Sequence, residues 1–159
     1  MATVAWLAPV PDPGRGAPRA RPVAAVGRLC YGSGMIPRTP EECDALFAHH
    51  MNADDLDALV GLYEPGATLI PAPGETAVGQ AAIREALAGL VAARTRITMH
   101  VVRVLRAGDD LAALYNDWRA TLIGPDGQQL EVAGKAIEVV RRQPDGTWRF
   151  AIDDPYARG

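Results

Sequence analysis

The chain has 159 residues, of which 48% are hydrophobic and 22% are charged, and a formal net charge of −3 at neutral pH. This length suits one domain of ordinary size that can bury a real core. No apolar run approaches the roughly 18 residues that a membrane span needs. The slightly acidic balance and the lack of a basic, aromatic-rich stripe argue against nucleic acid. We therefore expect a globular protein whose partners include neither a membrane nor a nucleic acid.

Residues 1–34 differ from the rest of the chain. They hold five prolines and four arginines but a single acid, so they carry +3, whereas residues 35–159 carry −6. The prolines exclude a continuous helix, and few apolar residues remain for a core. The segment can be a disordered tail, an extension upstream of a true start at Met35, or a weak targeting segment; we favour the first two. The predicted domain covers residues 35–159.

Three helices are predicted in the next part of the chain. The first begins at Pro40, because Thr39 can cap it and proline suits the first helical position. The second begins after Asp54 and carries its apolar stripe as far as Tyr63. The predicted helices cover about residues 40–51, 55–63 and 79–93, and residues 67–70 form a short strand between the last two.

Residues 94–154 are predicted to form four long antiparallel strands. Clusters of Gly, Pro and Asp at residues 108–110, 124–127 and 143–146 are hairpin signals, since glycine supplies positive φ and proline presets φ. Alternation fixes the two sides of each strand but not which side is concave. It puts Ile152 and Asp154 on the side of Phe150. Helices followed by an antiparallel sheet predict an α+β fold.

Two cysteines, Cys30 and Cys43, lie outside any spacing typical of a metal site. Two reduced thiols are the simplest interpretation, and they predict a cytoplasmic protein. The adjacent His49 and His50 point about 100° apart on a helix, so they cannot chelate one metal as a pair. The chain also lacks a glycine-rich phosphate loop and a nucleophile elbow. We expect no metal and no cofactor.

At this point the sequence resembles a known family. The motifs that carry the resemblance are Asn52–Leu59, Leu62-Tyr63, Gly66–Leu69, Gly79–Arg84 and Asp145–Arg149, in this order. Together they resemble the nuclear transport factor two-like superfamily, in its SnoaL-like or ketosteroid-isomerase-like branch. The resemblance covers about Thr39 to Tyr156 and leaves out the N-terminal segment.

The resemblance implies a cone-shaped, curved antiparallel sheet wrapped around three N-terminal helices, a cystatin-like α+β barrel. The open end of such a cone holds an apolar pocket for a small hydrophobic molecule. Members of the superfamily are usually homodimers through the outer face of the sheet. They include isomerases, cyclases and hydratases as well as proteins without catalysis, so the function must be argued from the site.

Ketosteroid isomerase uses an Asp base and an oxyanion hole made of a Tyr and a protonated Asp. By the resemblance, the Tyr position falls at Phe47 and the base position near Pro71, with Ile70 before it. None of these three side chains can exchange a proton. The second acid falls at or beside Glu138. We therefore do not expect the mechanism of ketosteroid isomerase itself.

Glu138 is the leading catalytic candidate, since burial among apolar strand neighbours raises the pKa of a carboxyl. A Glu paired with a basic residue of a neighbouring strand is the alternative. His100 can form a dyad with Glu138 or Asp117, or be an ordinary sheet histidine. One of Asp153 and Asp154 can point inward, or both can lie at a solvated strand end. The catalytic candidates are thus Glu138, Asp117, His100 and Asp153, and the ligand-binding candidates are Phe47, His50, Tyr63, Asn116 and Trp118.

Two functions are compatible with these residues. The first is a cofactor-free isomerase, cyclase or hydratase that acts on a hydrophobic organic molecule. The second is a non-catalytic dimeric ligand-binding or accessory domain. Convergence of Glu138, Asn116 and Asp153 in one cavity favours the enzyme, whereas positions on the outer face of the sheet exclude it.

Overall fold

The computed structural model describes residues 35–158, and the predicted tail of residues 1–34 lies outside the described residues. The elements are α1 (Pro40–Asn52), α2 (Leu56–Gly61), β1 (Tyr63–Leu69), β2 (Ala77–Val78), α3 (Gly79–Ala92), β3 (Arg96–Ala107), β4 (Leu111–Ile123), β5 (Gln129–Arg142) and β6 (Trp148–Asp154). Helices followed by a curved sheet confirm the predicted α+β fold. No helix of this described part is long and apolar enough to cross a membrane.

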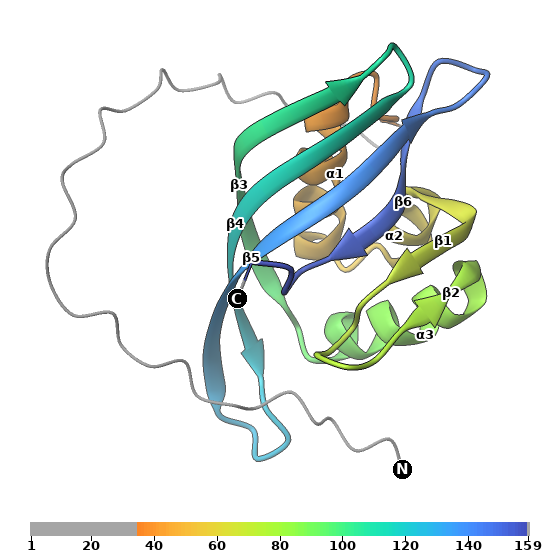
Figure 1. The fold of residues 1–159 in the computed structure, drawn as a ribbon. Coiled ribbons are helices and arrows are strands. Elements are labelled where there is room, and N and C mark those ends of the chain that lie inside the picture. Colours follow the sequence, from red (N-terminus) through yellow and green to blue (C-terminus); the bar gives the residue numbers. More distant parts are fainter. Residues whose placement is uncertain (1–34, 159) are drawn as a thin grey trace, which may run out of the picture.

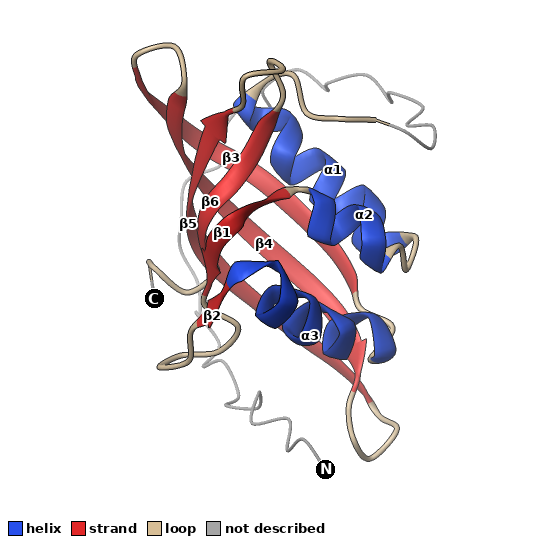
Figure 2. Cartoon of the chain, turned by 90° about the vertical axis from the view of Figure 1, so that its right-hand side faces the viewer, coloured by secondary structure: helices blue, strands red, loops and turns tan. Residues whose placement is uncertain are grey.

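The six strands form one curved sheet in the order β2-β1-β6-β5-β4-β3, and the three helices cover its concave face (Figures 1 and 2). The four long strands are antiparallel neighbours, as predicted. β1 runs parallel to β6, so the sheet is mixed rather than purely antiparallel. Because α1 packs on β3 and α3 packs on β1, the helices and the sheet enclose an interior between them.

The start of α1 matches the prediction. Thr39 is the N-cap in an extended conformation, and Pro40 is the first helical residue. The Glu42 carboxylate accepts hydrogen bonds from the backbone N–H groups of Arg38, at 2.6 Å, and Thr39, at 3.3 Å. Such bonds satisfy donors that lack a partner at a helix start. The cap therefore fixes where the helix that carries Asp44 begins.

The second helix is shorter than predicted. α2 ends at Gly61, and Tyr63 belongs to β1, where it pairs with Phe150 of β6. The prediction was wrong because a short apolar run fits a buried strand as well as a helix. Pro65-Gly66 lies inside β1, within the segment where the pairing with β6 shifts register, rather than at a helix end.

A β-bulge in β6 reverses the sides predicted for the end of this strand. Phe150 and Ile152 oppose adjacent residues of β5, so Ala151 is an extra residue. Beyond the bulge, Asp153 is buried on the concave side and Ile152 is 47% exposed on the outer side. The prediction that Ile152 and Asp154 share the side of Phe150 was wrong, because it assumed an unbroken period of two. The bulge brings Asp153 into the interior.

The core lies between the helices and the concave face. Its fully buried apolar side chains include Leu46, Met51, Leu59, Tyr63, Ile83, Leu87, Leu114 and Phe150. Burial of each such large side chain stabilises the fold by roughly 1.5–3 kcal/mol. The Phe150 ring contacts the rings of Phe47 and Tyr63, with centroids 6.2 and 5.1 Å away. This packing joins α1, β1 and β6.

Candidate functional site

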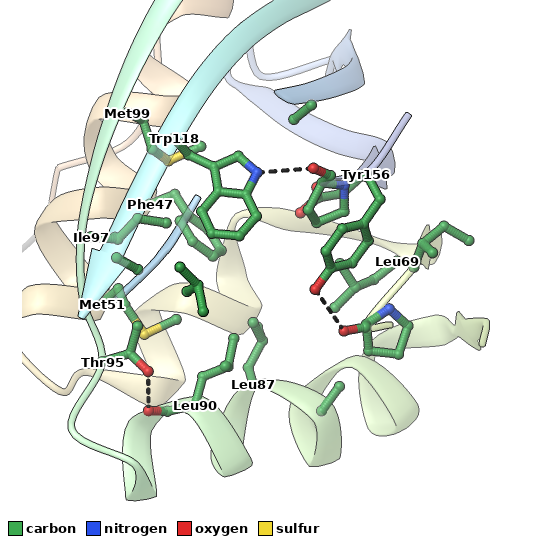
Figure 3. A pocket seen from close by; sticks show the side chains of 18 of the residues that line it. Phe47, Met51, Leu69, Leu87, Leu90, Thr95, Ile97, Met99, Trp118 and Tyr156 are labelled. Atoms are coloured by element: carbon green, nitrogen blue, oxygen red, sulfur yellow. Dashed lines mark hydrogen bonds between the residues drawn. The ribbon is translucent and has the colours of Figure 1, made fainter. Parts of the chain in front are cut away.

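A cavity of about 80 Å³ lies between the concave face of the sheet and helices α1 and α3 (Figure 3). Its walls include Phe47, Met51, Leu69, Leu87, Leu90, Ile97, Met99, Trp118, Ala136 and Tyr156. Among its lining residues, Glu138 and Asp153 are the only Asp, Glu, Lys, Arg or His side chains. We call this cavity the cone pocket. An apolar wall with few polar groups at one place is typical of a small-molecule site.

Trp118 forms a wall of the cone pocket and is held from two sides. Gly134 of β5 lies directly opposite it in the sheet, and a Cβ at Gly134 would come within 2.6 Å of the indole ring. The indole Nε1 donates a hydrogen bond to the carbonyl of Pro155 at 2.9 Å, and the ring of Tyr156 meets the indole edge-on. The glycine therefore makes room for the indole, and the segment after β6 fixes its orientation.

Two acids lie side by side in the cone pocket. Glu138 on β5 and Asp153 on β6 are direct partners in the sheet, so their side chains are cross-strand neighbours. They are 2% and 5% exposed. Burial raises the pKa of Glu138 well above its usual range, and the negative charges of Asp44 and Asp153 raise it further. Burial also raises the pKa of Asp153, to about 7.

Tyr63 lies next to Asp153 and is not among the residues that line the cone pocket. Its hydroxyl donates a hydrogen bond to Asp153 Oδ2 at 2.5 Å. Burial and the charge of Asp153 hold the pKa of Tyr63 well above its usual value, so the phenol keeps its proton. The Tyr63 hydroxyl can therefore orient the Asp153 carboxyl. This differs from the ligand contact predicted for it.

Asn116 connects Glu138 to a third acid, Asp44 of α1. Its side-chain nitrogen donates hydrogen bonds to Glu138 Oε1 at 2.7 Å and to Asp44 Oδ2 at 2.9 Å. Asp44, Asn116 and Glu138 are each at most 2% exposed. Burial raises the pKa of Asp44 as well as that of Glu138. Two neighbouring buried carboxyls cannot both ionise freely, so the raised pKa values of Asp44 and Glu138 favour a proton held on this pair.

The remaining predicted residues lie away from the acids. His100 and Asp117 face each other on the exposed outer side of β3 and β4, and Asp117 forms an ion pair with Arg158 at 2.6 Å. His50 is buried, with Nδ1 4.0 Å from Asp55, and it does not line the cone pocket. Burial lowers its pKa. The structure therefore does not bring His100, Asp117 or His50 to Glu138.

Of the predicted set, Glu138 and Asp153 line the cone pocket together with Phe47 and Trp118. Asn116 reaches the pocket through its hydrogen bond to Glu138. The predicted alternative in which Glu138 pairs with a basic residue is wrong, since no ion pair to Glu138 is found among residues 35–158. No group of three or more His, Cys, Asp or Glu in this part of the chain could hold a metal ion.

Sequence reasoning missed Asp44. The signal was present, because Asp44 lies three residues before Phe47, and residues three apart share a helix face. An acid on the apolar face of a helix needs a partner in the core. Tyr156 and Met99, which also line the cone pocket, carried no signal beyond being apolar or aromatic.

The sequence pattern of the SnoaL-like domain family matches residues 44–151, and the protein therefore belongs to that family. No curated protein sequence matches the chain. The match to the family pattern confirms the predicted SnoaL-like family, and solved structures, among them a nuclear transport factor 2-like superfamily protein from Salmonella enterica, share the fold.

Three of these structures illustrate the range of the fold. A ketosteroid isomerase-like protein from Erwinia carotovora atroseptica is 19% identical with a TM-score of 0.64, over 72% of this chain and 89% of its own. A candidate scytalone dehydratase from Novosphingobium aromaticivorans is 18% identical with a TM-score of 0.66, over 74% and 80%. A candidate calcium/calmodulin-dependent protein kinase type II association domain from Thiobacillus denitrificans is 24% identical with a TM-score of 0.62, over 76% and 98%.

Proposed function

We propose that the protein is a cofactor-independent enzyme that binds a small hydrophobic molecule in the cone pocket and transfers a proton on it, as in an isomerisation or a dehydration. One observation carries this proposal. Glu138 and Asp153 are neighbouring buried carboxyls, and they are the acidic side chains in the largely apolar lining of the cone pocket. Buried acids with raised pKa values gather at catalytic sites, because acid–base chemistry needs them.

Asp153 suits the role of the proton-transfer group. Its pKa of about 7 allows its carboxyl to take up a proton and return it near neutral pH. In an isomerisation, a carbon of the bound molecule gives its proton to the Asp153 carboxylate, and Asp153 returns the proton to another carbon. Tyr63 would keep the carboxyl aimed by its hydrogen bond. Glu138, beside it, would hold the polar end of the molecule.

Deuterium exchange tests this proposal without knowledge of the natural substrate. The protein is incubated in D₂O with a panel of small hydrophobic ketones and aminoketones with at most one ring, and deuterium uptake next to the carbonyl is followed by NMR. We expect uptake with the native protein and a loss of about 10²–10⁴-fold in its rate with Asp153→Asn. Asp109→Asn, in the exposed turn after β3, is the matched control. Equal rates for the two variants would contradict the proposal.

The second candidate function is a non-catalytic, dimeric association domain. A row of apolar side chains crosses the outer face of the four long strands, formed by the cross-strand partners Leu105, Ala113, Val139 and Ile152. Leu105 is 39% exposed and Ile152 is 47% exposed. We call these four residues the outer row. An exposed apolar patch is typical of a protein contact, and we propose that the outer row joins two copies of the chain.

A further inference from the structure

The hydrogen-bond donors around the cone pocket are already in use. Trp118 Nε1, the Tyr156 hydroxyl and the Thr95 hydroxyl each donate to a backbone carbonyl, at 2.9, 3.4 and 2.7 Å (Figure 3). The hydroxyl of Tyr63 donates to Asp153, and the amide of Asn116 donates to two carboxyls. Apart from a proton on the carboxyls themselves, the side-chain N–H and O–H groups at the pocket therefore point to protein acceptors rather than to a ligand.

Some buried side-chain oxygens of the site, in contrast, accept no hydrogen bond from another side chain or from the backbone of residues 35–158. Glu138 Oε2, Asp44 Oδ1 and Asn116 Oδ1 are buried and have no hydrogen-bond partner within the described part of the chain. Buried polar atoms are almost always paired, so each unpaired one calls for a partner. When one carboxyl is protonated, a side-chain hydrogen bond between Asp44 and Glu138 satisfies part of this demand. A carboxyl oxygen has two lone pairs, so Glu138, which lines the pocket, keeps acceptor capacity. A ligand that fits must bring a donor.

The charges around the site agree with this requirement. Asp44, Glu138 and Asp153 are buried together, and none of them forms an ion pair among residues 35–158. Whichever of these three carboxyls is ionised therefore carries a negative charge that, within the part of the chain that the structure describes, has no basic side chain beside it. A buried charge without an opposite charge is costly, and a ligand cation would relieve that cost. A ligand anion would add to it.

The apolar walls also suit a cation that carries a ring. Phe47, Trp118 and Tyr156 present aromatic side chains to the pocket, and Met51 and Met99 present thioethers. Aromatic rings attract a positively charged nitrogen as well as an apolar skeleton. The cavity of about 80 Å³ limits the skeleton to a small one.

We propose that the cone pocket binds a small hydrophobic amine in its ammonium form, whose nitrogen donates to Glu138 and Asp153 while its apolar part lies against Trp118. This inference rests on the proposed function in one respect, that the cone pocket is the ligand site. It adds the chemical class of the ligand. Carboxylates and phosphates should bind less well, because an ionised acid of the site repels them.

Three probes with nearly the same skeleton test the inference: 2-phenylethylamine, 2-phenylethanol and phenylacetate. Binding to the full chain is measured by thermal shift and by calorimetry. We expect the amine to bind at least about tenfold more tightly than the alcohol, and phenylacetate to cause no shift. In Glu138→Gln the preference for the amine should disappear while the alcohol still binds. Glu85→Gln, on the exposed face of α3, should keep the preference.

The outcomes separate this inference from the proposed function. Equal binding of the amine and the alcohol, or tighter binding of phenylacetate, would contradict the preference for an amine. The proposal that the cone pocket is the ligand site would still stand. If none of the three probes binds to the folded protein, both the amine ligand and the cone pocket as the ligand site are contradicted. Asp153→Asn, with Asp109→Asn as its control, repeats the comparison on the second carboxyl, so the test does not depend on the folding of one variant.

Discussion

Polar side chains are buried on the concave face of the sheet and exposed to solvent on the outer face. On the concave face, Asn116 is 0% exposed and hydrogen-bonded to two buried acids. On the outer face, its neighbour Asp117 forms an ion pair with Arg158 while its own side chain stays 48% exposed. Water screens the outer pair, whereas the buried acids act on one another with little screening. Adjacent residues of one strand therefore belong to two different environments, and only the concave one can perturb a pKa strongly.

The first prediction concerns the pH dependence of stability, where we expect the largest effect. Asp153 has a pKa of about 7 in the folded protein and about 3.9 in the unfolded chain. Between these values the folded protein binds more protons than the unfolded chain does, so the free energy of unfolding falls as the pH rises. The difference of about three pKa units corresponds to a loss of roughly 4 kcal/mol. The raised pKa values of Glu138 and Asp44 act in the same direction.

Urea denaturation at pH 5 and pH 8 measures the part of this loss that lies between those two pH values, which is about two thirds of it. In Asp153→Asn the slope should be reduced, because the asparagine cannot titrate and its carbonyl can still accept the hydrogen bond from Tyr63. Asp109→Asn should leave the slope unchanged. A stability that rises from pH 5 to pH 8 in the native protein would show that the concave acids are not buried as described.

The second prediction compares neighbouring residues of β4. Asn116→Ala removes the amide that serves both Glu138 and Asp44, and we expect a loss of about 3 kcal/mol in the free energy of unfolding, since buried charged groups lose their partner. Asp117→Ala removes an exposed ion pair, and we expect a loss of less than about 1 kcal/mol. Both are measured by urea denaturation at one pH. Similar losses would mean that the two faces do not differ.

The contrast between the faces could be predicted only in part. The four strands and their turns follow from local signals, since alternation and glycine or proline clusters act within a few residues. Glu138 and Asn116 could be assigned to their strand faces for the same reason. These local signals also gave the start of α1 at Pro40 and the helix that became α3.

The features that could not be predicted depend on residues that are distant from one another in the sequence. The bulge at Ala151 depends on how β6 pairs with β5, so alternation alone put Asp153 on the wrong side. The burial of Asp44 depends on which strand α1 meets. Tyr63 fits the apolar pattern of a helix and of a strand equally well, and only its pairing with Phe150 selects the strand.

The third prediction tests the wall of the cone pocket. In Gly134→Ala the new methyl group would press on the Trp118 indole, and we expect a loss of about 1–3 kcal/mol in stability together with a change in tryptophan fluorescence. The control is Gly89→Ala in α3, where a Cβ meets nothing within 4 Å. That substitution should stabilise the protein by about 0.4–1 kcal/mol, because alanine suits a helix better. If both variants were stabilised, Gly134 would not be needed for the position of Trp118.

The last prediction concerns the outer face, where a substitution should barely change the stability of the single chain. Ile152 lies in the outer row, and its side chain is 47% exposed in the single chain. The substitution Ile152→Lys should therefore change the free energy of unfolding by no more than about 0.5 kcal/mol. If the outer row joins two copies, however, a lysine there would be buried without a partner, and the dimer should dissociate. Sedimentation at several protein concentrations measures the oligomeric state.

Val78→Lys is the control for the outer row. Val78 is 63% exposed and lies on β2, at the opposite edge of the sheet from β3. The Val78→Lys substitution should leave the oligomeric state unchanged, whereas Ile152→Lys should yield a folded monomer. If the native protein is monomeric at all concentrations, the outer row is not an interface between two copies. A monomeric Ile152→Lys that keeps the proton-transfer activity would show that the concave face works without the contact on the other side.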